Sequence, residues 1–438
     1  MSVTSISPAD LHARARALVP GGTHSSTRAR DPYPCYAQRA EGPWLWDVEG
    51  TRWTDFGMGN AAVMLGHAHP AVTEAVVRSV TDGLTCGTET ATAVEAVETL
   101  RTMIPDFGLA RFAVTGTEAL MHALTIARQV TGRERVAKAE GAYHGWADSL
   151  WVSTWGTPDT IGPPERPASP PGSAGLSRAA ADTVVFPFND LPATAAILRE
   201  HAADLAAVVL EPVLIDIGFI PAEPAYLQGL RELTAELGIV LIFDELLTGF
   251  RLEPGGARAH YGVTPDLTTY GKALGNGYPI AAVEGRADLM AVTDTLAGGP
   301  VQWVGTFNGH GSAVAAAAAA LPILATGEPQ RHLHRLTNRL RDGFVDLARR
   351  HRIPVLVAGL GGHFQPYFLP AAPRDYRQAM ATHTERYLHL VRTAERHHLL
   401  LPPKALLHGA LGAAHTEAEV DALLAAADEA FATDPTRS

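Results

Sequence analysis

The segment IVLIFDELLTGFR, residues 239–251, constrains the fold more than any other stretch of the chain. Five apolar residues run without interruption and are followed at once by two carboxylates, Asp244 and Glu245. A continuous apolar run of this length predicts a strand that is buried on both faces of a sheet. An ionised carboxylate at the end of such a strand is costly unless a cation meets it. The sequence therefore predicts a cationic partner for Asp244.

Two other segments follow the same pattern. RFAV, residues 111–114, precedes TGT and a helix, and LAAVVLEPV, residues 205–213, is a buried run that reaches a carboxylate at Glu211. Apolar strands that alternate with amphipathic helices predict an α/β fold whose parallel sheet is covered on both faces. Ligands of such sheets bind at the carboxyl ends of the strands, where we expect both Glu211 and Asp244.

The length of 438 residues predicts more than one domain. We expect an N-terminal segment over 1–70, with two strands about the turn at Glu49-Gly50, and a large ligand-binding domain over 71–312. Residues 313–438 begin as an Ala/Leu-rich helix and predict a smaller C-terminal domain. Residues 157–175 contain six prolines and predict a loop.

Composition excludes several classes of function. The formal net charge of -11 argues against a nucleic-acid partner, because such proteins are normally basic. Only two cysteines occur, which fits a reducing cytoplasm rather than a disulfide scaffold. No stretch approaches the ~20 apolar residues of a membrane span, and no signal-peptide core precedes the first helix. We therefore expect a cytoplasmic protein that binds neither nucleic acid nor membrane.

Two loops contain residues suited to a flat, phosphorylated ligand. TGTEA, residues 115–119, sets a glycine and free amide groups at the start of a helix expected from about Glu118, which suits a phosphate. EGAYHGWAD, residues 140–148, sets Tyr143 and His144 among glycines, where an aromatic ring can stack on a ligand ring. Taken alone, each motif is more often an ordinary α/β turn or a plain loop aromatic than a ligand site.

A third loop, YGKALGNGYP, contains Lys272. Most lysines lie on the surface, but a lysine held within a site forms an imine with an aldehyde. Pyridoxal phosphate uses all of these features, since it has a phosphate, a flat ring, an aldehyde and a basic ring nitrogen. Its pyridinium would be the cation that Asp244 requires, and the protonated ring would accept electrons from a substrate carbanion.

These motifs resemble the class III aminotransferases of fold type I, in the branch of the glutamate-1-semialdehyde 2,1-aminomutases. The resemblance covers nearly the whole chain. The matching segments, in order, are PGGTHSSTR, LGHAHP, TGTEA, TGRERV, EGAYHG, LEPV, IFDELLTGFR, GGARAHYGVTPDLTTYGKALGNGYP, GTFN and LLPPKALLHGALGAAHT. The resemblance implies a large, mostly parallel sheet domain and a smaller α+β domain formed by the N- and C-terminal segments. It also implies pyridoxal 5'-phosphate as cofactor and a homodimer that shares its sites.

The resemblance assigns roles to individual residues. Lys272 is expected to form the Schiff base and to move the proton, and Asp244 to pair with the pyridine nitrogen. Arg28 stands where relatives bind a substrate carboxylate, and Asn60 is expected beside the substrate. The other cofactor-binding residues expected are Gly116, Thr117, Tyr143, His144, Glu211, Asp216 near the ring hydroxyl, and Thr306, which in this family reaches over from the other subunit.

Departures from the aminomutase pattern favour an aminotransferase with a ping-pong mechanism. Asn60 replaces a usual aromatic residue, Leu407 replaces a usual glutamate, and the loop at 157–175 is rich in proline where aminomutases have glycine. We expect an amino acid donor and a keto acid, keto-sugar or keto-cyclitol acceptor, with the aminomutase reaction as the alternative.

Two other classes of function are compatible with parts of the sequence. His67 and His69, with Asp244 and Glu245, are residue types that bind a catalytic metal, but no third spaced ligand motif accompanies them. We expect no metal site. A binding protein that retains the fold without the chemistry is the second alternative, and Lys272 argues against it because that residue would have no role.

Overall fold

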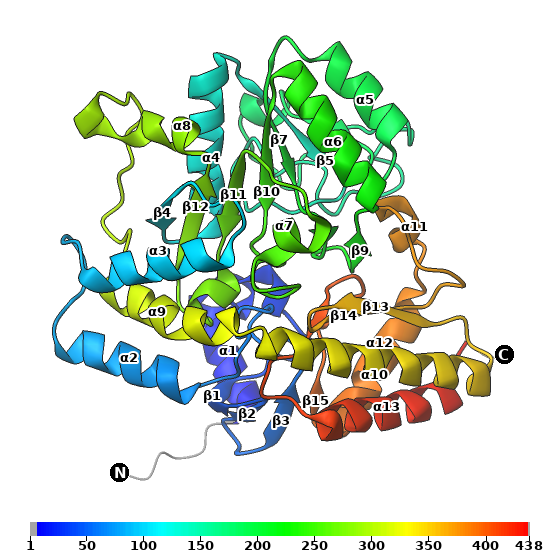
Figure 1. Cartoon of the computed structure of the whole chain (residues 1–438). Coiled ribbons are helices and arrows are strands. Elements are labelled where there is room, and N and C mark those ends of the chain that lie inside the picture. Colours follow the sequence, from blue (N-terminus) through cyan, green and yellow to red (C-terminus); the bar gives the residue numbers. More distant parts are fainter. Residues whose placement is uncertain (1–6, 437–438) are drawn as a thin grey trace. The chain divides into compact units, whose positions relative to one another are not determined.

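The computed structural model describes residues 7–436, and its contacts divide the chain into two compact units (Figure 1). The larger unit comprises Pro70–His332 and Pro373–Ala381. The smaller unit comprises the residues up to His69, Leu333–Ala372, and the residues from Thr382 onward. Segments from both ends of the chain therefore build the smaller unit, as the resemblance implies.

The larger unit is built on a seven-stranded sheet in the order β4-β12-β11-β10-β7-β5-β6. Only β12 runs antiparallel to its neighbours, so the other six strands point in one direction. This result confirms the predicted mostly parallel sheet. The strands are β4 (Leu109–Ala113), β5 (Arg135–Ala139), β6 (Val184–Phe186), β7 (Leu205–Leu210), β10 (Val240–Asp244), β11 (Leu267–Tyr270) and β12 (Ala281–Gly285).

Helices cover this sheet because its strands are apolar on both faces. Val240 and Ile242 of β10 pack in one core cluster with α4, and the alternate residues Leu241 and Phe243 are buried on the other face, where α6 contacts the strand. The other elements of this unit are α2 (Pro70–Thr81), α3 (Ala91–Met103), α4 (Gly116–Thr131), α5 (Leu191–Glu200), α6 (Pro224–Leu237), α7 (Gly256–Tyr261), α8 (Ala287–Met290), α9 (Gly311–Ala325), α11 (Tyr376–Met380), and the short pair β8 (Val213–Leu214) and β9 (Ile220–Pro221).

Helix α4 begins two residues before the predicted start at Glu118. Thr115 is its N-cap, and the Thr115 side chain accepts from the Glu118 amide while the Glu118 carboxylate accepts from the Thr115 amide. This reciprocal capping box satisfies two of the amide groups at the helix start. Gly132 ends the helix in a left-handed conformation with φ 68°.

The smaller unit contains two sheets. One has the order β1-β2-β3-β15, and the other has the order β13-β14-β16. The predicted strand pair about Glu49-Gly50 is confirmed as β2 and β3. The elements are α1 (Pro8–Leu18), β1 (Ala37–Glu41), β2 (Trp44–Asp47), β3 (Arg52–Asp55), α10 (Glu328–His351), β13 (Leu356–Leu360), β14 (His363–Tyr367), α12 (Thr384–Arg396), β15 (Leu399–Leu400), β16 (Gly409–Ala410) and α13 (Glu417–Ala432).

The division of the chain differs from the predicted boundary after residue 312. Helix α9 packs against α2 and α3 and so falls in the larger unit, and α10 contains the point at which the chain enters the smaller unit. Residues 157–175 form turns and one isolated bridge, as predicted for a loop. Over residues 7–436 no single helix is long and apolar enough to span a membrane, although α9 and α10, bent by 69°, meet the length and composition criteria as a pair.

Candidate active site

The predicted site residues of the larger unit lie where the strands end. Because β4, β5, β7, β10 and β11 run in one direction, their carboxyl ends share one edge of the sheet. Each strand leads into a predicted residue at this edge: Gly116 and Thr117 after β4, Tyr143 and His144 after β5, Glu211 and Asp216 after β7, Asp244 at the end of β10, and Lys272 after β11.

Asp244 is buried and is held by three donors. Its Oδ2 lies 2.8 Å from Nδ1 of His144, and its Oδ1 accepts from the Leu246 amide at 3.1 Å and from Thr269 Oγ1 at 3.4 Å. Burial lowers the pKa of His144, and the hydrogen bond to Asp244 only partly opposes this effect. We therefore assign a neutral imidazole whose Nδ1–H donates to the carboxylate. Nε2 of His144 is buried without a partner among residues 7–436.

The two carboxylates that end β10 point to different partners. Glu245 accepts from the amides of Ala257 and Arg258, at 2.5 and 2.9 Å, and so caps the start of α7. Burial raises the pKa of Glu245 to about 7. Only Asp244 of the pair therefore serves the strand-edge site, whereas Glu245 stabilises a helix.

Two more carboxylates lie near Asp244. Glu211 accepts from the Tyr143 amide at 3.0 Å and from the Ile215 amide at 3.4 Å. Burial, with the charges of Asp216 and Asp244, raises the pKa of Glu211 well above its ordinary value. Burial also raises the pKa of Asp216, against the opposing charge of Lys272. The three acidic groups interact electrostatically, and such a cluster favours a cation.

Three aromatic residues of the loop after β5 form a cluster. Tyr143 lies parallel to Trp155, with ring centroids 5.9 Å apart and planes at 11°, and Trp151 meets both rings edge-on. Trp155 donates from Nε1 to the Asp216 carbonyl at 3.3 Å. Burial, reinforced by Asp216 and Asp244, raises the pKa of Tyr143 to about 12, so its phenol stays neutral. The cluster provides a flat apolar surface next to the acidic groups.

Lys272 begins a short 3-10 helix, Lys272–Gly275, directly after Gly271. Its φ of 46° is left-handed, a conformation that costs a non-glycine residue roughly 1–2 kcal/mol. Such strain is concentrated at functional sites. The side chain is half-buried, and its charge acts on Asp216. The structure thus brings a constrained amine to the acidic edge of the sheet.

The first amides of α4 have no intrahelical hydrogen bond. The first intrahelical bond joins the Ala119 amide to the Thr115 carbonyl, so the amides of Gly116 and Thr117 precede the helical ladder. A Cβ on Gly116 would lie 2.3 Å from Cδ1 of Leu246, and a Cβ on Gly145 would lie 2.4 Å from Oγ1 of Thr117. Gly145, at φ 77°, therefore lets the loop after β5 approach this helix end, where an anion is favoured.

Three further predicted residues do not follow the strands of this sheet. Thr306 is exposed in the larger unit, between the exposed side chains of Val304 and Phe307. Arg28 ends a 3-10 helix, Ser26–Arg28, of the smaller unit, and its side chain is exposed. Asn60 is also exposed in the smaller unit and has a left-handed φ of 54°.

Of the residues considered for a metal site, His67 and His69 belong to the smaller unit, and Asp244 and Glu245 belong to the larger unit. His67 lies in the smaller unit and bonds Asp55, with 2.8 Å between Nε2 and Oδ2. Across the described part of the chain, no group of three or more His, Cys, Asp and Glu side chains has a metal-binding arrangement.

Sequence reasoning missed one buried charge at this edge. Lys138 of β5 is fully buried, and its ammonium donates to oxygens of the loop after the strand. The available signal was a lysine placed among apolar residues in RVAKA.

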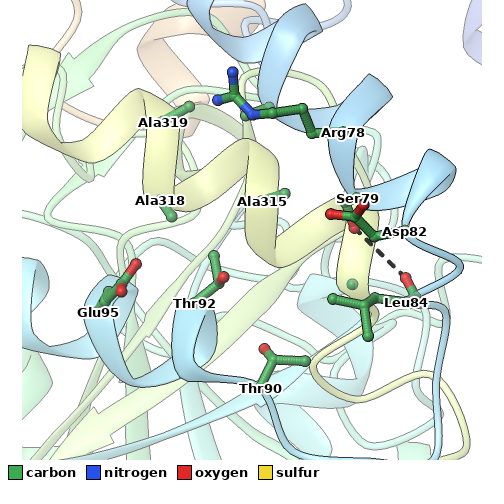
Figure 2. A pocket seen from close by; sticks show the side chains of 12 residues that line it. Arg78, Ser79, Asp82, Leu84, Thr90, Thr92, Glu95, Ala315, Ala318 and Ala319 are labelled. Atoms are coloured by element: carbon green, nitrogen blue, oxygen red, sulfur yellow. Dashed lines mark hydrogen bonds between the residues drawn. The ribbon is translucent and has the colours of Figure 1, made fainter.

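A cavity of about 330 Å³ lies between α2, α3 and α9, apart from these residues (Figure 2). Small residues of α9 and polar side chains of α2 and α3 are among the residues that line it. The labelled residues are Arg78, Ser79, Asp82, Leu84, Thr90, Thr92, Glu95, Ala315, Ala318 and Ala319.

Comparisons with known proteins agree with this geometry. The family model of the class III aminotransferases matches residues 25–374. The chain is 37% identical over 430 residues to a glutamate-1-semialdehyde 2,1-aminomutase of Chloroflexus aurantiacus, covering 96% of this chain and 95% of the relative. An omega-transaminase from Sphaerobacter thermophilus superposes with a TM-score of 0.92 at 36% identity over 98% of both chains. A transaminase with bound pyridoxal phosphate superposes with a TM-score of 0.87 at 31% identity over 97% of both chains.

Proposed function

The chain belongs to the class III aminotransferases, fold type I enzymes that use pyridoxal 5'-phosphate, and from this premise we propose that it transfers an amino group from an amino acid donor to a carbonyl acceptor. The observation that carries the proposal is the buried acidic edge of the sheet, where Asp244 is oriented by His144 and an amine, Lys272, follows the neighbouring strand.

The residues of this edge fit the cofactor. The free amides of Gly116 and Thr117 would hold its phosphate, and Tyr143 would cover one face of its ring. Asp244 would hold the ring nitrogen, and the acidic groups around it explain why a cationic ring is favoured there. Lys272 would fasten the cofactor through its amine. When bound, the cofactor supplies an electron sink that stabilises the carbanion left when the donor loses its α-proton.

The residues of the chain would then manage protons and orientation. Once the donor amine has displaced Lys272, its free Nζ would take the α-proton from the donor and would return a proton to the carbon to which Lys272 had been attached, acting as base and then as acid. Asp244 would keep the ring nitrogen protonated, and the hydrogen bond from His144 holds its carboxylate in one orientation. In a ping-pong cycle, water would supply the carbonyl oxygen of the first product, and the amino group of the donor would stay in the site until the acceptor enters. The same groups would then act in reverse order.

The substrate assignment rests on the sequence resemblance. Arg28 would bind a carboxylate, and the amide of Asn60 would make the pocket polar, which suits a keto acid, a keto-sugar or a keto-cyclitol. A panel of amino donors, each followed by loss of the visible absorbance of the bound cofactor, tests this proposal directly. Acceptors are then supplied to the enzyme that has released its first product. A panel that yields no amino transfer between two molecules would overturn the proposal.

The aminomutase reaction is the second candidate, because relatives at 37% identity carry that name. It needs one substrate, whose amino group moves within a single molecule. The two reactions are separated by giving the enzyme glutamate 1-semialdehyde alone. Efficient conversion to 5-aminolevulinate, with no turnover of any donor and acceptor pair, would favour the aminomutase and exclude our main proposal.

We also propose a homodimer with a site shared between subunits. Large apolar side chains are exposed on α2, on α3 and in the turn between them: Val77, Val80, Leu84 and Val94. Thr306 lies between two further exposed apolar residues, Val304 and Phe307. Sedimentation of the wild type should give twice the monomer mass, and Val80→Glu should shift the equilibrium towards monomer. A monomeric wild type with full activity would contradict a shared site.

A further inference from the structure

Lys138 contributes an ammonium group to the interior of the larger unit. It lies in β5, and its side chain is fully buried. Nζ donates to the carbonyls of Ala142 at 2.6 Å, Leu150 at 3.0 Å and Val152 at 2.7 Å, and to Oγ1 of Thr154 at 3.1 Å. An ammonium has three N–H donors, and four oxygens surround them, so every donor is engaged.

A lysine occupies this position although the chain contains few lysines and many arginines. Lys138, Lys272 and Lys404 are its only ones, although Lys and Arg together number 35. A lysine ammonium is compact and its three donors point in different directions, whereas a guanidinium is planar and larger. Only the compact group suits a closed cage of three carbonyls and a hydroxyl.

The four oxygens belong to one loop that returns on itself. Ala142 directly precedes Tyr143 and His144. The other three oxygens belong to Leu150, Val152 and Thr154, which alternate with the aromatic part of the loop that contains Trp151 and Trp155. Oγ1 of Thr154 also donates to the Ala142 carbonyl at 2.9 Å, so the cage joins the start of the loop to its end. Apart from one isolated bridge at Val152, the segment 140–156 has no strand or helix to hold its shape.

The charge of Lys138 also acts on the acidic edge. Burial lowers its pKa to about 7, and the carboxylates of Glu211 and Asp244 oppose that effect. Its charge in turn contributes to the low pKa of His144. The ammonium of Lys138 therefore belongs to the same electrostatic cluster as Glu211 and Asp244.

We propose that Lys138 is a positioning residue: its ammonium fixes residues 142–154, so that Tyr143 faces the cofactor ring and His144 meets Asp244. This inference rests on the proposed function, in that Tyr143 and Asp244 are taken to face the cofactor. The inference also gives different roles to Lys138 and Lys272. The amine of Lys138 is occupied by protein oxygens and cannot attack an aldehyde, which leaves that role to Lys272.

Three variants of the holoenzyme test the inference: Lys138→Met, Thr154→Val and the control Lys404→Met, which removes the same charge from an exposed side chain. The readouts are the visible circular dichroism of the bound cofactor, its dissociation constant and kcat. Lys138→Met should weaken cofactor retention and kcat by roughly tenfold or more, because a buried charged donor is lost, and should reduce the dichroism. Thr154→Val should change the same quantities in the same direction by a smaller factor.

A merely structural role would lower thermal stability and leave these three quantities unchanged for the folded, loaded protein. Wild-type dichroism, affinity and kcat in a folded Lys138→Met would therefore overturn the inference. If Lys138→Met does not fold, Thr154→Val decides, since it keeps the shape of the side chain and removes only the hydroxyl. The dichroism does not depend on the substrate, so the inference and the proposed function fail separately.

Discussion

Nδ1 of His144 lies 2.8 Å from Oδ2 of Asp244, and both side chains are buried. The two residues are 100 positions apart in the sequence, and they meet because β5 and β10 end at the same edge of the sheet. A neutral imidazole that donates to the carboxylate orients it without neutralising it. Asp244 is therefore held in one orientation by a partner that carries no charge of its own.

Asp244→Asn should fold and lose activity by roughly 100-fold to 1,000-fold, because an amide cannot hold a proton on the ring nitrogen. Steady-state kinetics of the loaded variant measures the loss, and Asp159→Asn, an exposed aspartate, should be unaffected. His144→Phe should cost less in the wild type and nearly nothing further in the Asp244→Asn background. Full additivity of the two substitutions would contradict their coupling.

Gly145→Ala should weaken binding of the cofactor phosphate. The added Cβ would meet Oγ1 of Thr117 at 2.4 Å, and φ is 77°, so the loop must shift away from the start of α4. Gly132→Ala is the matched control, since it adds the same methyl at φ 68° with nothing within 4 Å. Both should lose about 1 kcal/mol of stability, but only Gly145→Ala should raise the cofactor dissociation constant. Equal dissociation constants would exclude this steric role.

The apoprotein should become less stable as pH rises from acid towards neutral. Burial and two neighbouring carboxylates raise the pKa of Glu211. Its protonated form thus adds stability that is fully present below the ordinary pKa of 4.5 and is lost as pH rises through the raised value. Thermal unfolding of the apoprotein between pH 4 and about 8 measures this loss, which should shrink in Glu211→Gln. An identical pH dependence in the two proteins would contradict the burial of an acidic charge.

The site residues that could be predicted share one property: each is indicated by a pattern in the few residues next to it in the sequence. The apolar run before Asp244, the glycines around Lys272 and the threonine before α4 each imply a strand end, a tight loop or a helix start. The structure places Lys138 and Glu245 by contacts that no local pattern contains. The cage of Lys138 forms only when residues 142–154 fold back, and Glu245 meets the start of α7 twelve positions later.

The short helix α11 could not be placed from the sequence either. Residues 373–381 follow β14 of the smaller unit, yet they pack within the larger one. Arg377 makes two hydrogen bonds to the buried carboxylate of Glu140, at 2.8 and 2.6 Å, and donates to the carbonyls of Ile161 and Gly162. One guanidinium therefore joins the loop of Tyr143 to the proline-rich segment 157–175.

Arg377→Ala should destabilise the protein by about 3 kcal/mol, because the carboxylate of Glu140 loses its buried partner. It should also increase proteolytic cleavage within 157–175. Arg374→Ala is the control on the same segment, since the exposed pair of Arg374 with Glu223 should contribute less than about 1 kcal/mol. Thermal unfolding and limited proteolysis report both effects. Equal destabilisation by the two variants would argue that Arg377 does not fasten the loop.

The attachment of the cofactor tests the central claim most directly. Borohydride reduction of the holoenzyme, followed by peptide mass mapping, identifies the lysine that carries the cofactor, and the chain offers only Lys138, Lys272 and Lys404. We predict a single modified peptide that contains YGKALG, with Lys138 and Lys404 unmodified. A reduced cofactor on Lys138, on Lys404 or on no lysine would contradict the account.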